Sequence, residues 1–153
     1  MKTILRFLFI LMIVLTIVAY QVFFMESDSS KELYYEVGKM KIAETEIEVE
    51  ISDTDEKRVR GLSGRDNLDY NKGMLFVFDS PDLHGIWMKD MKFPIDVIWL
   101  DEFREVVYIE KNMTPDSFPK IFKTPKLALY VLEVRSGFVE ENSVNTGDIF
   151  GFR

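Results

Sequence analysis

A run of nineteen residues without a charge, residues 7–25, divides this chain into two parts of different character. The run is rich in Phe, Leu, Ile and Val, and as a helix rising about 1.5 Å per residue it would extend roughly 28 Å. That length is enough to cross the hydrocarbon core of a bilayer. We therefore predict a transmembrane helix within residues 1–25, a polar linker over 26–32 and a single folded domain over 33–153.

Charges on either side of the apolar run predict its orientation. Lys2 and Arg6 precede the run, whereas Glu26 and Asp28 follow it. Because positive residues favour the cytoplasmic side, we expect a cytoplasmic N-terminus and an extracytoplasmic domain at the cell membrane. The alternative is a signal peptide that is cleaved, which would leave the domain secreted. The run is longer than the usual apolar core of a signal peptide, about 7–15 residues, and this favours an uncleaved signal anchor.

The part of the chain after the apolar run is strongly acidic. It holds all 26 acidic residues and 17 of the 19 basic residues, which gives a net charge of −9. A domain of this charge repels the phosphate backbone of nucleic acids, so we expect no nucleic-acid partner. Strong acidity also keeps a domain soluble.

The sequence offers almost none of the cysteine and histidine ligands that zinc and copper sites use. It has no cysteine, which excludes disulfides, thiolate metal sites and cysteine nucleophiles. His84 is the only histidine, and no catalytic dyad is visible around it. Residues 67–71 resemble the start of a calcium loop, but Lys72 stands where that loop requires glycine, and Phe78 where its last carboxylate belongs. We therefore predict no metal site and no cofactor.

Short apolar runs recur through the acidic part and predict a mainly β domain. Residues 46–51 alternate between acidic and apolar side chains, which is typical of a strand with one face in water. A weaker strand over 33–43 is expected to form a hairpin with it. Further strands are expected at residues 74–78, 95–100, 106–109, 127–134 and 149–152.

Two short helices complete the predicted α+β domain. Thr54 can cap a helix with acidic residues in its first turn, and Gly61 or Gly64 can end it. Residues 138–142 are expected to form one further helical turn. Together these elements predict a small, curved antiparallel sheet or a partly open barrel. Residues 112–126, which contain three prolines, are expected to form a mobile or binding loop.

Six short motifs occur in a fixed order along the soluble part. They are Arg60-Gly61-Leu62-Ser63-Gly64-Arg65, Gly73-Met74-Leu75-Phe76-Val77-Phe78, Trp87-Met88-Lys89, Pro94-Ile95-Asp96, Tyr130-Val131-Leu132-Glu133, and Gly137 with Gly147-Asp148.

The order of these motifs resembles the uncharacterised family called domain of unknown function 192, over about residues 45 to 152. Ser63 departs from the methionine that is frequent there, which concerns packing more than chemistry. The resemblance implies a small, mostly β domain that is often secreted or tethered to a membrane. It implies no established activity, so no catalytic residue is carried over.

Asp96 and Glu133 are the two polar residues that most need an explanation, because each lies within an apolar predicted strand. Alternation places Asp96 on the face of Ile98, and Glu133 on the face of Val131. A carboxylate on such a face is costly unless it is paired or hydrogen-bonded. One interpretation is an ion-pair or carboxylate-to-backbone network that fixes strand register. The other is an acidic pocket in the mouth of a barrel.

Four cationic or aromatic residues are candidates to accompany the two acids. Lys89 and Arg65 are possible ion-pair partners of the carboxylates, as is Arg60. Trp87, beside Lys89, can bind a planar or sugar-like ligand or serve as a large core side chain. The candidate ligand-binding residues are Arg65, Trp87, Lys89, Asp96 and Glu133.

The residues leave three functions open. We favour a non-catalytic, membrane-tethered extracytoplasmic module that binds a small molecule or an envelope protein. The second is a small hydrolase or transferase with Asp96 or Glu133 as general base and Lys89 stabilising negative charge. The third is a structural envelope protein in which all the motifs serve folding. The three differ in whether the polar residues converge on one open cleft.

Overall fold

The computed structural model describes residues 6, 10–21, 33–42 and 44–152, and the chain divides into two compact units. In the first unit, residues 10–21 are helical and their side chains are exposed. Among the described residues, no helix combines the length and the apolar character that crossing a bilayer requires. The predicted membrane segment, residues 7–25, lies partly outside the described residues, which omit 7–9 and 22–25.

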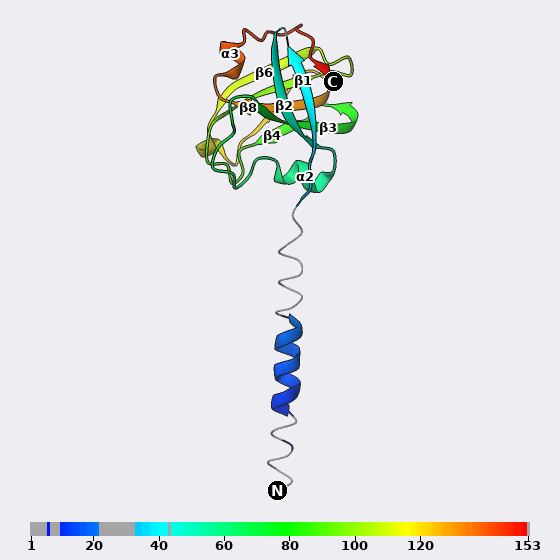
Figure 1. Ribbon diagram of the computed structural model, residues 1–153, viewed down its shortest axis with the longest axis vertical. Coiled ribbons are helices and arrows are strands. Elements are labelled where there is room, and N and C mark those ends of the chain that lie inside the picture. Colours follow the sequence, from blue (N-terminus) through cyan, green and yellow to red (C-terminus); the bar gives the residue numbers. More distant parts are fainter. Residues whose placement is uncertain (1–5, 7–9, 22–32, 43, 153) are drawn as a thin grey trace. The chain divides into compact units, whose positions relative to one another are not determined.

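The second unit is mainly β. Its described residues form a seven-stranded sheet, in the order β6-β5-β8-β3-β2-β1-β9, and a two-stranded sheet of β4 and β7. The strands are β1 (Glu36–Ile42), β2 (Thr45–Ser52), β3 (Lys72–Asp82), β4 (Gly85–Trp87), β5 (Ile95–Leu100), β6 (Val106–Met113), β7 (Ile121–Lys123), β8 (Ala128–Arg135) and β9 (Gly151–Phe152). The helices are α2 (Asp55–Arg60), the 3-10 turn η1 (Pro115–Ser117) and α3 (Phe138–Glu141). Figure 1 shows the large sheet strongly curled, like half of a barrel, with few short helices around it.

The hairpin of β1 and β2 follows from alternation in the sequence. Ile47 and Val49 are buried, whereas Glu46 and Glu48 between and beside them are exposed. β1 pairs with β2 along its whole length in antiparallel register. The weaker strand that the sequence indicated before residue 44 is therefore present, in the predicted hairpin.

The sheet is mixed, whereas the sequence predicted an antiparallel one. β2 and β3 are parallel, with Glu50 opposite Met74. A parallel pair requires a crossover connection, and residues 53–71, which contain α2, provide it. α2 begins and ends as predicted: the Thr54 hydroxyl accepts a hydrogen bond of 3.3 Å from the Lys57 amide, and Gly61 ends the helix. The alternating pattern of β2 did not reveal that β3, its neighbour on the side away from β1, runs parallel to it.

The curled sheet has an apolar cluster on each face. One cluster contains Leu75, Leu132 and Phe150, and the other contains Met74 and Trp99. Adjacent residues of β3 thus point into opposite clusters, as strand geometry requires. Strands β8 and β5 pair in the middle of the sheet, and every residue of β5 is buried.

The segment expected to be a loop, residues 112–126, contains ordered elements. η1 and β7 both lie in it, and β7 pairs with β4, so that Trp87 lies opposite Ile121. The last predicted strand is shorter than expected: β9 is Gly151–Phe152, and Ile149 forms an isolated bridge with Glu105.

Candidate functional site

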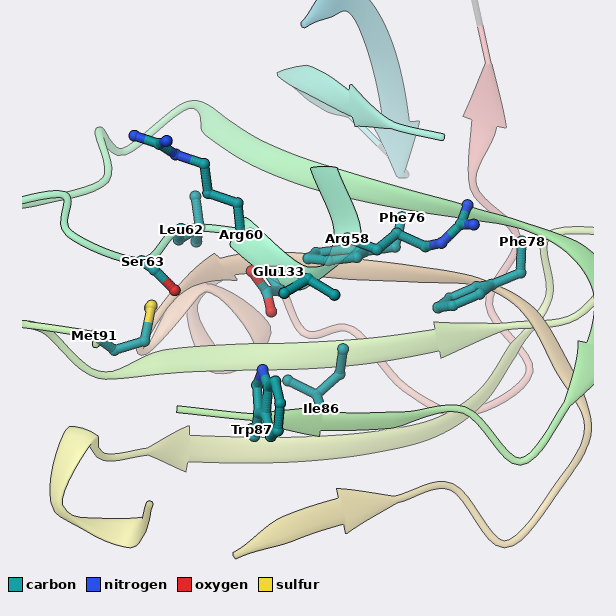
Figure 2. A pocket seen from close by; sticks show the side chains of 12 residues that line it. Arg58, Arg60, Leu62, Ser63, Phe76, Phe78, Ile86, Trp87, Met91 and Glu133 are labelled. Carbon is teal, nitrogen blue, oxygen red and sulfur yellow. The ribbon is translucent and has the colours of Figure 1, made fainter. Parts of the chain in front are cut away.

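A pocket of about 60 Å³ opens between α2, the turn that follows it, β3, β4 and β8. Its volume is enough for a few water molecules or a small polar group. Figure 2 shows the Glu133 carboxyl group at the centre of the pocket, with Ser63 and Met91 on one side and Ile86 and Trp87 on another. The walls are mostly apolar, and Glu133 is the acidic residue among them.

The position of Glu133 follows from the register of the sheet. On β8, Glu133 lies between Met74 of β3 and Val97 of β5. Cross-strand neighbours point to the same face, so the carboxyl group stands in a row of apolar side chains. The residue is 4% exposed, and its Oε2 atom has no hydrogen-bond partner among the described residues. A buried polar atom without a partner is costly and therefore informative.

Burial changes the protonation of Glu133. Removal of the carboxyl group from water raises its pKa to about 8, and the positive charge of Arg65 opposes this rise. A burial effect of this kind is typical of carboxyl groups in apolar pockets. Near pH 7 the group is therefore mainly protonated, and it can donate a hydrogen bond as well as accept one.

Burial raises the pKa of Glu133 and the positive charge of Arg65 opposes that rise, but the Arg65 side chain is already paired with another acid. Its guanidinium group donates two hydrogen bonds, of 2.6 and 2.7 Å, to the Glu50 carboxylate. The same guanidinium lies 5.9 Å from the centre of the Tyr35 ring. The hydroxyl of Tyr35 is buried without a partner among the described residues, and burial raises its pKa. Since Glu50 neutralises Arg65, Glu133 has no counterion of its own among the residues that the structure describes.

Asp96 lies on the opposite face of the sheet from Glu133. Its Oδ1 accepts a hydrogen bond of 2.9 Å from the Asn112 amide, and its Oδ2 accepts bonds of 3.0 and 3.1 Å from the amides of Gly137 and Val139. The carboxyl group is 1% exposed and joins β6 and the first turn of α3 to β5. This is the carboxylate-to-backbone network that the sequence offered as one interpretation.

Lys89 pairs with neither acid. Its side chain is exposed, and no carboxylate of the described residues lies within 4.0 Å of its Nζ. The ammonium group lies 6.0 Å from the centre of the Trp87 ring. Trp87 itself lines the pocket and is 40% exposed. The pocket thus brings together Glu133 and Trp87 with Arg65 nearby, and leaves Asp96 and Lys89 elsewhere.

Several residues of the pocket were missed by sequence reasoning. Arg58 and Ser63 line it, and Arg60, considered only as an ion-pair partner, lines it too. Arg58 donates a 2.7 Å hydrogen bond to the Val77 carbonyl, whereas the head of Arg60 points away from Glu133. Arg60 and Ser63 belong to the first of the six motifs, and that motif was the only feature of the sequence that could have pointed to their place in the pocket.

Other candidate chemistry does not converge on the pocket. The His84 ring stacks on Phe78 at 3.5 Å, and its Nε2 lies 3.1 Å from the Ser80 carbonyl oxygen. In the part of the chain that the structure describes, no group of three or more His, Asp or Glu side chains is arranged to hold a metal ion.

Comparison with known proteins shows the family of the chain. A protein of Sinorhizobium meliloti, named only provisionally as a transcription regulator, is 26% identical and superposes with a TM-score of 0.75, over 79% of this chain and 97% of its own. A protein of unknown function from Novosphingobium aromaticivorans is 23% identical, with a TM-score of 0.71 over 80% of this chain and 88% of its own. No curated protein matches. Residues 38–152 match the family DUF192, described as "Uncharacterized ACR". The chain therefore belongs to the DUF192 family, for which no activity is established.

Proposed function

We propose that the domain is a non-catalytic binding module whose pocket takes a small polar ligand at Glu133. One observation carries the proposal: a carboxyl group that is 4% exposed and has an unpartnered Oε2 atom lines an open pocket. A ligand with a carbonyl or hydroxyl oxygen would accept a hydrogen bond from the protonated group. The face of Trp87 at the same pocket would contact the apolar or planar part of that ligand.

A neutral ligand is repelled by no charge at the pocket, whatever the pH. Arg58 and Arg60 line it and repel a cationic ligand, and Arg65 nearby has the same sign. Above a pH of about 8, Glu133 loses its proton, and its unpartnered Oε2 atom then repels an anionic ligand. A small amide or polyol meets neither obstacle.

The geometry supports binding more than hydrolysis or group transfer. Asp96, one candidate base, already accepts three backbone hydrogen bonds on the other face of the sheet. Lys89, the candidate for stabilising negative charge, is exposed and contacts Trp87. Glu133 therefore stands without the partners that the enzymatic hypothesis required. A purely structural role leaves the unpartnered carboxyl group unexplained.

A screen of small molecules tests the binding proposal. Three groups of fragments are assayed by thermal shift at pH 6.5. The first contains neutral amides and polyols, the second carboxylates, and the third amines. We expect neutral fragments to stabilise the wild-type protein and Glu133→Gln, which keeps a donor, but not Glu133→Leu. Glu102→Leu, at an exposed position, is the matched control and should keep binding. Equal stabilisation of Glu133→Leu and the wild type would contradict the proposal.

We also propose that the module is tethered to the cell membrane by residues 7–25, with the domain outside the cytoplasm. The support is the uncharged run and the charge asymmetry around it. In intact spheroplasts, external protease should degrade the domain, and the protein should fractionate with membranes. Full-length protein recovered from the cytosol would contradict the tether, and shortened protein in the medium would show cleavage and secretion instead.

A further inference from the structure

The lysines of the described residues fall into two groups. Five form ion pairs of 4.0 Å or less with nearby carboxylates: Lys39 with Glu46, Lys41 with Glu44, Lys57 with Asp53, Lys72 with Asp69, and Lys92 with Asp66. The other five have no such partner among the described residues: Lys89, Lys111, Lys120, Lys123 and Lys126. Four of these flank or belong to β4 and β7. In this acidic domain, most of the lysines without an ion pair are thus gathered in one region.

The same region exposes large apolar side chains. In the small sheet, Trp87 lies opposite Ile121, and the ring of Phe118 meets that of Trp87 edge-on at 6.3 Å. These three side chains are 40%, 51% and 44% exposed, in that order. On the inner face of this sheet, Ile86 and Phe122 pack into the core. The outer face therefore presents apolar surface that no described residue covers.

Cations and apolar groups are interleaved on this face. The ammonium group of Lys89 lies 6.0 Å from the centre of the Trp87 ring. Lys120 is not part of this face, because its Nζ lies 3.9 Å from the centre of the Phe122 ring on the inner side. Lys123 is on the same side of β7 as Ile121, since strand residues two apart share a face. We call this set the basic-aromatic patch; its members are Trp87, Lys89, Phe118, Ile121 and Lys123.

We propose that the basic-aromatic patch rests on the surface of an anionic lipid bilayer. Tryptophan favours the interface between lipid and water, and lysine stems can lie along apolar surface while their ammonium groups reach lipid phosphates. The unpaired lysines complement the negative charge of that surface. The remainder of the acidic domain is repelled by it, so the charge distribution orients the patch toward the lipid. This contact is separate from the proposed tether, but it shares Trp87 with the proposed ligand pocket at Glu133.

Tryptophan fluorescence can test this proposal in the full chain. The sequence has two tryptophans, and both lie in the domain: Trp99 is 0% exposed, whereas Trp87 is in the patch. The protein is reconstituted in vesicles of phosphatidylcholine, alone or mixed with phosphatidylglycerol, with brominated acyl chains as quencher. We expect the fluorescence of Trp87 to be quenched in the mixed vesicles. In vesicles of phosphatidylcholine alone, quenching should be at least twofold weaker. In Trp87→Phe, the quenched component should be lost. Quenching should also weaken as salt rises from 0.1 to 1 M, where the screening length falls from about 10 to about 3 Å.

Two double variants distinguish the effect of the patch from the effect of total positive charge. Lys89→Gln with Lys123→Gln should reduce quenching at least twofold. Lys72→Gln with Lys92→Gln, which removes two lysines already paired with acids, should not reduce it. Far-UV circular dichroism confirms that each variant is folded. Unquenched Trp87, equal quenching in both kinds of vesicle, or equal effects of the two double variants would overturn the proposal. Unquenched Trp87 would direct attention to an acidic protein partner.

Discussion

At the scale of single residues, Asp96 connects three parts of the fold through its carboxylate. Removal of the side chain in Asp96→Ala leaves the partly buried amide of Gly137 and the buried amide of Val139 without their acceptor. Because each unsatisfied buried donor costs about 1–3 kcal/mol, we expect the unfolding free energy to fall by about 3 kcal/mol. Urea denaturation measures it, and Asp79→Ala at an exposed position is the control. A loss below about 1 kcal/mol, typical of a surface site, would contradict this role.

Glu133 makes stability depend on pH in the opposite sense to most acids. Its pKa rises from 4.5 when unfolded to about 8 when folded, so between these values the folded state holds more protons. The stabilisation is complete below the unfolded pKa and is lost as pH rises through about 8. With 1.36 kcal/mol per pKa unit, we expect a loss of about 3 kcal/mol between pH 5 and 8.

Urea midpoints at several pH values, compared with those of Glu133→Gln, isolate this contribution. The variant cannot ionise at this position, so its stability should fall less over the same range. Glu102→Gln, at an exposed position, should follow the wild type. Parallel curves for the wild type and Glu133→Gln would show that burial does not raise the pKa of Glu133.

The sequence could identify Asp96 and Glu133 as unusual, but not place them. Carboxylates in apolar strands are recognisable from alternation alone. Their separation depends on register: Asp96 is opposite Val134, and Val97 is opposite Glu133. The two acids therefore point to opposite faces, although they lie on neighbouring strands. Register between distant strands is a tertiary property, which no local pattern contains.

At the scale of elements, the turn after α2 shapes the pocket and depends on glycine. Gly61 has φ +49° and ψ −134°, a conformation that a side chain strains, and an added Cβ would lie 3.3 Å from Phe76. We expect Gly61→Ala to lower the unfolding free energy by about 1–3 kcal/mol. In Gly38→Ala, the added Cβ meets only ordinary contacts of 3.5 Å or more. The midpoint temperature of thermal unfolding should be clearly lower for Gly61→Ala than for Gly38→Ala. Equal midpoints would contradict the claim that a side chain at residue 61 is strained.

The elements that the sequence predicted well are those with local signals. The cap at Thr54, the alternation of residues 46–51 and the apolar run of β5 all specify structure within a few neighbouring residues. β4 and β7 have only three residues each and form a sheet only because they meet each other. A segment of three residues is too short to show an alternation of apolar and polar side chains, and the prolines around β7 favour a loop.

At the scale of the whole molecule, the domain is expected to fold without the N-terminal apolar run. The unit Tyr35–Arg153 is compact by itself and holds both apolar clusters. A chain shortened to begin at Leu33 should be soluble, show a far-UV spectrum dominated by β structure, and unfold in one cooperative urea transition. Aggregation, a mainly helical spectrum or a transition without cooperativity would contradict this expectation.

The order of strands in the large sheet has a consequence for when the protein can fold. β8 lies between β3 and β5, which do not adjoin each other, so the sheet remains in two halves until β8 is added. A ribosome produces β8 after both of its neighbours, when most of the chain is already made. A chain exported from its N-terminus would therefore enter a translocation channel while its sheet is still divided. Whatever the route of the chain, the two halves of the sheet can join only once β8 has been made.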